Sequence, residues 1–224
     1  MKSLIGAVVG VFGLAASAAA QVPVAIVEDA QGKVEGVEFM DYVAPGKIIK
    51  LGPKATVVLG YMNSCWRETI TGGTVIVGAE ESMVHLGDVQ RVKVDCDGSS
   101  VQLSDREANQ SAATTFRNLK PGQRAATPPP PQLTLYGLSP IVEVKGGGTL
   151  VVERIDAHGE RYTVPLRSNA LVRGKFYDFA KAKVSLTAGG TYAASLGSRT
   201  TTFKIDTHAT SGSTPIIGRL LRLE

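Results

Sequence analysis

The chain has 224 residues, of which 43% are apolar and 20% are charged, with a formal net charge of +4 at pH 7. This composition is that of a folded globular protein and excludes an extended disordered chain. The basic excess is too small for the dense positive stripe of nucleic-acid-binding proteins, so no nucleic-acid partner is expected. Beyond the first segment no apolar run approaches the roughly 20 residues of a membrane helix, so no span is expected there.

The first 20 residues have the pattern of a secretory signal peptide. Lys2 precedes an apolar stretch over residues 4–16, and the small residues at 18–20 suit signal peptidase. We therefore expect cleavage before Gln21 and a periplasmic or secreted mature protein. The alternative is an uncleaved anchor, for which the apolar stretch is short.

Cys65 and Cys96 are the two cysteines of the chain. In an oxidising compartment two cysteines most simply form a disulfide, which we expect here. A reactive thiol is the alternative, but the sequence has no C-x-x-C pair and shows no neighbouring base.

Short apolar runs separated by glycine predict an all-β fold from residue 22 onward. In the first half the expected strands cover residues 22–27, 47–51, 56–61, 65–70, 74–77 and 89–96. Period-two alternation in the last of these strands places Cys96 on the same face as Val94. Gly-Gly-Thr sequences at Gly72, Gly147 and Gly189 predict tight turns that open strands.

A helix and a linker are expected to separate the two halves. The sequence over residues 104–107 is a capping box and predicts about three helical turns before Phe116. Four consecutive prolines at 128–131 predict a semi-rigid linker over residues 118–132. In the second half the expected strands cover residues 133–138, 141–144, 149–155, 161–164, 182–186, 191–196, 200–205 and 217–223.

The first half carries a resemblance in residues 45–60, PGKIIKLGPKATVVLG, where a glycine turn precedes an apolar strand. This stretch resembles the FecR-type β-rich domain of bacterial envelope proteins, over about residues 24–103. The runs 36–42 and 64–68 are similar to a group of secreted, uncharacterised α-proteobacterial proteins. The membrane anchor and anti-sigma segment of the signalling FecR members are not found, so the resemblance implies no transmembrane signalling.

The second half carries the sequence LTAGGTY at residues 186–192. It resembles the tyrosine corner of immunoglobulin and fibronectin-III sandwiches, which implies that the Tyr192 hydroxyl bonds to nearby backbone. The expected fold class is therefore all-β, with one short helix and two small domains. These are a FecR-like domain over residues 21–117 and an immunoglobulin-like sandwich over residues 133–224.

No catalytic motif, metal-ligand set or cofactor motif is found in the sequence, and we expect no enzyme activity, metal or cofactor. His85, His158 and His208 each lack a second ligand at metal spacing, and G-x-S-x-G is absent. The acidic residues at 80–81 and 95–97 are expected in solvated turns. Two carboxylates that meet only in the fold, as in glycoside hydrolases, stay possible because their pairing is spatial.

Two groups of residues are candidates for binding a partner. The densest basic stretch contains cations interleaved with aromatics, namely Arg173, Lys175, Phe176, Tyr177, Lys181 and Lys183. Such a set suits an anionic polymer, the alternative being core aromatics beside solvated lysines. Tyr61 and Trp66 flank Cys65 and are candidate interface anchors, the alternative being packing against the disulfide.

These patterns predict an exported non-catalytic module that holds an envelope protein or an anionic polysaccharide. The first alternative is a regulatory protein that senses the envelope. A less favoured alternative is a carbohydrate-active hydrolase, whose sign would be two carboxylates converging in a cleft. The sequence does not predict the oligomeric state.

Overall fold

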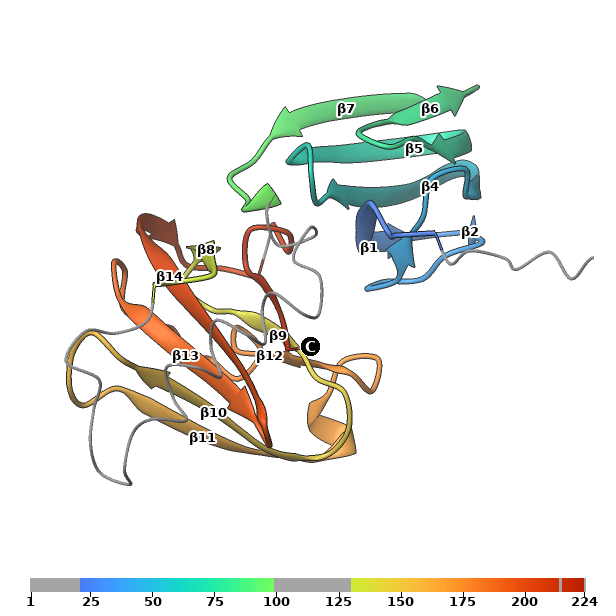
Figure 1. Cartoon of the computed structure of the whole chain (residues 1–224). Helices are drawn as coiled ribbons and strands as arrows, with labels where there is room; N and C mark the ends of the chain where they lie inside the picture. The colour runs from blue at the N-terminus through green and yellow to red at the C-terminus, as the bar shows by residue number, and fades with distance from the viewer. Residues whose placement is uncertain (1–20, 99–129, 214, 224) are drawn as a thin grey trace, which may run out of the picture.

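The computed structural model describes residues 21–98, 130–213 and 215–223 (Figure 1). Within these ranges the protein has 15 strands in three sheets and one 3-10 turn, η2 (Ser168–Ala170), which confirms the predicted all-β class. The predicted signal peptide, the predicted helix and most of the predicted linker lie outside the described residues.

The described N-terminal half, residues 21–98, is a seven-stranded antiparallel sheet in the order β3-β1-β4-β5-β6, with β2 on β4 and β7 on β5. Its strands are β1 (Ala25–Gln31), β2 (Val34–Glu35), β3 (Tyr42–Val43), β4 (Ile48–Tyr61), β5 (Trp66–Val77), β6 (Ser82–His85) and β7 (Asp88–Lys93). Alternate residues of the central strands, such as Ile49, Val57 and Val75, are fully buried and form the core of this half.

β4 and β5 are longer than the sequence predicted. Residues 48–51 and 56–61 belong to one strand, with a register shift between Leu51 and Thr56. The predicted turn at Gly72 is wrong, because Gly72 and Gly73 have φ of +67° and +79° yet stay within β5. They bend the strand, so that its first part pairs with β7 and its second part with β6.

The C-terminal half is a sandwich of two sheets, with strand orders β11-β10-β13-β14-β8 and β12-β9-β15 in the described residues. Its strands are β8 (Leu133–Gly137), β9 (Ile141–Glu143), β10 (Gly148–Arg154), β11 (Arg161–Leu166), β12 (Phe176–Asp178), β13 (Thr191–Leu196), β14 (Arg199–Thr210) and β15 (Leu220–Arg222). Phe179, Tyr192 and Phe203 are fully buried between the sheets.

The strand predicted over residues 182–186 is wrong. Turn hydrogen bonds occupy this region, from Ala182 N to Asp178 O (3.1 Å) and from Lys183 N to Ala180 O (3.0 Å). Lys183 also has a φ of +57°, a left-handed conformation that a residue other than glycine does not adopt within an extended strand. The apolar residues nearby are buried by packing onto the sandwich rather than by strand pairing.

The tyrosine corner is present in the second half. The Tyr192 hydroxyl accepts a hydrogen bond from Thr187 N (2.9 Å) and donates one to Glu160 Oε2 (2.7 Å). Burial, together with the Glu160 carboxylate, raises the pKa of Tyr192 well above its usual value. The backbone bond that the resemblance implied is therefore confirmed.

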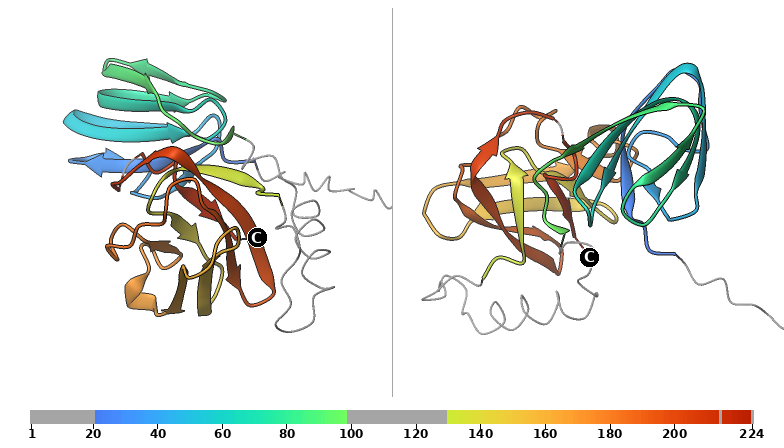
Figure 2. Two further views of the ribbon diagram at one scale, coloured as in Figure 1. Left: turned by 90° about the vertical axis from the view of Figure 1, so that its left-hand side faces the viewer. Right: turned by 90° about the horizontal axis from the view of Figure 1, so that it is seen from above.

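The two halves lie side by side (Figure 2) and share a hydrophobic cluster that we call the joint. Its buried members are Ile26, Met40 and Met62 from the first half and Ile141, Phe176, Ile216, Ile217 and Leu220 from the second. Packing therefore holds the halves together in addition to the chain that connects them.

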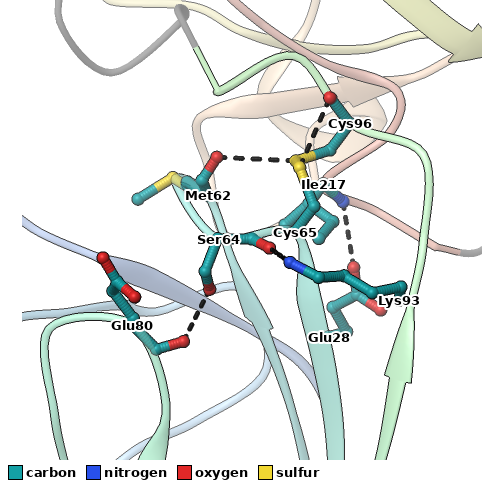
Figure 3. Close-up of a disulfide and its surroundings, with 8 residues drawn as sticks. All are labelled: Glu28, Met62, Ser64, Cys65, Glu80, Lys93, Cys96 and Ile217. Atoms are coloured by element: carbon teal, nitrogen blue, oxygen red, sulfur yellow. Dashed lines mark hydrogen bonds between the residues drawn. A yellow bond between two sulfur atoms is a disulfide. The ribbon is translucent and has the colours of Figure 1, made fainter.

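Glu28 is the central polar group of the joint. Its fully buried carboxylate accepts hydrogen bonds from Arg67 Nε (2.7 Å) and from the backbone N–H of Ile217 (2.9 Å), the latter shown in Figure 3. Gly60 makes this contact possible, because a Cβ there would lie 2.6 Å from Ile217 Cγ2 and 2.9 Å from Glu28 Oε1. A second bridge runs from the Tyr42 hydroxyl to Glu143 Oε2 (2.8 Å).

Candidate functional site

The predicted disulfide between Cys65 and Cys96 is present, with Cα atoms 5.6 Å apart (Figure 3). It connects the turn after β4 to the segment after β7. Val94 N also donates to Cys65 O (3.0 Å), and both Val94 and Cys96 pack against the joint. The disulfide therefore fixes residues 94–97 where they meet the C-terminal half.

A cleft of about 290 Å³ lies beside this segment, between the two halves. Lys93, Val94 and Asp95 line it from the first half. Residues from β8, β14 and the segment before β15 line it from the second half, including Tyr136, Gly137, Asp206, His208, Gly218 and Arg219. The cleft exists only because the halves are joined.

Gly218 allows the two walls of the cleft to approach each other. A Cβ on Gly218 would lie 2.6 Å from Asp95 O of the first half, so a larger residue there would force the walls apart. Gly137 allows close packing within the second wall, because a Cβ there would lie 3.0 Å from Arg219 Cβ.

The polar groups available in the cleft are mainly acidic. Burial raises the pKa of Tyr136, and the negative charges of Asp97, Asp206 and Asp95 raise it further. Of the two cations of the lining, Arg219 is neutralised by Asp178, whereas Lys93 keeps its charge, with Nζ bonded to Ser64 O and 4.6 Å from the Trp66 ring centre. The lining thus presents two carboxylates, of which Asp206 Oδ1 already accepts the backbone N–H of His208 (2.7 Å), together with a phenol, an imidazole and an ammonium group.

Tyr61, a predicted interface anchor, is fully buried in the core of the first half, which corrects that prediction. Its hydroxyl lies 2.8 Å from Ser82 Oγ. The adjacent Glu68 carboxylate is also fully buried and accepts hydrogen bonds from Ser82 N (3.1 Å) and Arg91 Nε (2.7 Å). This polar cluster ties β6 and β7 across the bend of β5.

Trp66 is partly buried beside the disulfide. It packs against the core of the first half, with Lys93 over its ring. The role of Trp66 as an interface anchor stays a prediction.

The predicted basic stretch does not form one surface. Arg173 pairs across the joint with Glu38 and with Asp41 (2.9 Å) of the first half. Lys175 Nζ lies 5.5 Å from the Tyr42 ring centre.

The remaining residues of the basic stretch also have different surroundings. Phe176 is fully buried in the joint, which corrects its assignment as a contact residue. Tyr177 packs edge-on against Phe179, with ring centres 5.2 Å apart. Lys181 and Lys183 are exposed.

Burial raises the pKa of Tyr61 to about 12, against an ordinary value near 10. The folded protein thus binds this proton more tightly than the unfolded chain. The resulting stability is complete below about pH 10 and is lost as the pH rises toward about 12. We expect Tyr61→Phe to reduce the loss of stability over this pH range, as measured by urea unfolding at several pH values. If the free energy of unfolding of Tyr61→Phe falls as steeply with pH as that of the wild type, this role of Tyr61 is contradicted.

Sequence reasoning missed the cleft and the joint. Asp95 was expected in a solvated turn and His208 was not assigned a role, while Tyr136, Asp206 and Glu28 were not singled out. Glu28 and Ile217 are 189 positions apart, and no local pattern marks either as a contact of the other.

Within residues 21–98, 130–213 and 215–223, no cluster of three or more His, Cys, Asp or Glu side chains is arranged to hold a metal ion. In the same ranges no helix is long and apolar enough to cross a membrane. No protein-family model, curated protein or solved structure matches the chain.

Proposed function

We propose that this protein is an exported, non-catalytic module of the cell envelope that binds a polysaccharide in the cleft between its halves. The disulfide supports an oxidising compartment, in agreement with the signal-peptide pattern of residues 1–20. We further propose that the halves are a FecR-like domain and an immunoglobulin-like sandwich, the second supported by the tyrosine corner.

The observation that carries the binding proposal is the convergence of Tyr136, Asp95 and Asp206 on one cleft. Carboxylates accept hydrogen bonds from sugar hydroxyls, and an aromatic ring packs against the apolar face of a sugar. The volume of about 290 Å³ suits a short stretch of a longer chain. The acidic lining favours a neutral polysaccharide over the anionic polymer that the basic stretch suggested.

Binding to a panel of neutral and anionic envelope polysaccharides, measured by calorimetry, tests the proposal. We expect Tyr136→Ala to weaken binding by about tenfold or more, as for other central aromatic contacts. Lys181→Glu with Lys183→Glu is the matched control, because these exposed residues lie outside the cleft lining and belong to the basic stretch that the sequence offered as the alternative binding site. Binding that depends on the two lysines and not on Tyr136 would contradict the proposal.

The same geometry supports one second candidate, a carbohydrate-active hydrolase. Asp95 and Asp206 line the cleft from opposite halves, and such enzymes use a pair of carboxylates that flank the bond they cleave. Incubation with the bound polysaccharide, followed by analysis of the reducing ends, separates the two functions. Release of fragments that is abolished by Asp95→Asn and by Asp206→Asn would replace the binding module with the enzyme.

A further inference from the structure

The outer face of the N-terminal sheet carries a row of large apolar side chains. Ile48, Ile76 and Met83 are direct cross-strand neighbours on β4, β5 and β6. Ile48 is 52% and Met83 63% exposed, whereas the alternating residues Ile49 and Val75 are buried in the core. The row therefore lies on the face opposite the core, and it is too apolar for an ordinary solvent-exposed sheet face.

The two flanks of this row have opposite charge. On one flank the next cross-strand row contains Lys50 and His85, with the Lys33–Glu35 ion pair (3.0 Å) beside Lys50. On the other flank the turn between β5 and β6 carries Glu80 and Glu81, and Lys47 precedes the row on β4. Lys50 thus makes the first flank net positive. Among the described residues, Glu80 is the acidic group of the second flank that has no ion pair within its own copy to match the one between Glu81 and Arg91 (3.5 Å).

We propose that a second copy of this chain packs face to face on this row, with the two-fold axis running along it. Rotation by 180° about the row places apolar side chains on apolar side chains and exchanges the flanks. The Lys50 flank of each copy then faces the Glu80 flank of the other. An anionic surface would instead meet the repulsion of Glu80 and Glu81.

This inference goes beyond the proposed function and concerns a different surface. None of Ile48, Ile76 and Met83 lines the cleft or belongs to the joint. Pairing through the row therefore leaves the cleft between the halves open in both copies, and the dimer presents two clefts to one polymer.

Sedimentation velocity of the mature protein over a range of concentrations tests the proposal. We expect a monomer–dimer equilibrium, and we expect Met83→Ser to raise its dissociation constant by about tenfold or more. Val92→Ser is the matched control, because Val92 is 51% exposed on β7 but lies outside the row, and it is expected to behave as the wild type. Both side chains are exposed, so neither substitution removes core packing.

A charge exchange tests the orientation of the two copies. Lys50→Glu alone is expected to weaken the dimer, and adding Glu80→Lys is expected to restore it. Glu81 is left unchanged because it lies 3.5 Å from Arg91. The proposal is overturned by a monomer at every concentration, by a dimer indifferent to Met83→Ser, or by a dimer that Val92→Ser weakens equally. Failure of rescue by the charge exchange overturns the two-fold arrangement.

Discussion

Arg219→Met is expected to lower the free energy of unfolding by about 3–5 kcal/mol, the range for breaking a buried ion pair. The side chains of Arg219 and Asp178 are only 2% and 5% exposed, with Nη1–Oδ1 at 2.8 Å and Nη2–Oδ2 at 3.3 Å. The guanidinium also donates to Ser139 O and Ser213 O, both at 2.8 Å. Methionine would fill much of the space but would leave a buried carboxylate and two carbonyls without these donors.

Urea unfolding of the wild type, Arg219→Met, and Arg219→Met with Asp178→Asn measures this cost. Asparagine removes the buried charge and keeps an oxygen for the Ala180 N–H, which Asp178 Oδ1 accepts at 3.0 Å. We expect the double variant to recover a substantial part of the loss, because the unpaired charge is the larger penalty. A double variant less stable than the single variant would show that the charge of Asp178 is satisfied by other groups.

Replacement of Cys65 and Cys96 by serine is expected to cost about 3–4 kcal/mol by the chain-entropy account of a disulfide. The bridge closes a loop between residues 31 positions apart. The expected effect extends beyond the first half, since residues 94–97 contact the second half, including the bond from Thr134 N to Asp97 Oδ2 (2.6 Å). The cleft wall formed by Val94 and Asp95 is thus expected to loosen together with the joint.

Hydrogen exchange and urea unfolding of the double serine variant test both parts of this prediction. Exchange should rise in residues 94–97 and in the facing segment around Gly218, while β10 and β11, far from the bridge, serve as internal control. Reduced wild-type protein should behave as the double variant. Loss of stability without faster exchange at these positions would show that the bridge acts on the unfolded chain alone.

The local sequence was sufficient for several features of this protein. Alternation of apolar residues predicted the all-β class, because side chains of a strand point to its two faces in turn. The signal-peptide pattern and the presence of two cysteines predicted the pairing of Cys65 with Cys96, and the sequence over residues 186–192 predicted the bond of the Tyr192 hydroxyl to backbone. Each of these depends on neighbouring residues or on a choice among very few partners.

The bend of β5 and the burial of Tyr61 were decided by tertiary structure. Gly72 and Gly73 permit a turn or a bent strand equally well, and the pairing of β5 with both β6 and β7 selects the bend. Tyr61 has the composition of an interface anchor, but Ser82 and Glu68 give its hydroxyl a polar setting inside the core.

The site, too, depends on contacts between residues far apart in the chain. The Arg173–Phe176 segment is basic and aromatic in sequence, yet the first half supplies Glu38 and Asp41 as its partners. The cleft forms because Ile217 packs against Gly60 and donates its backbone N–H to Glu28. These contacts place Asp95 and Asp206 on opposite walls of one cavity. The sequence by itself determined the all-β class and which cysteines pair. Only the tertiary packing, within each half and between the halves, decided which polar groups are buried and which meet in a cleft, because burial is a property of two surfaces.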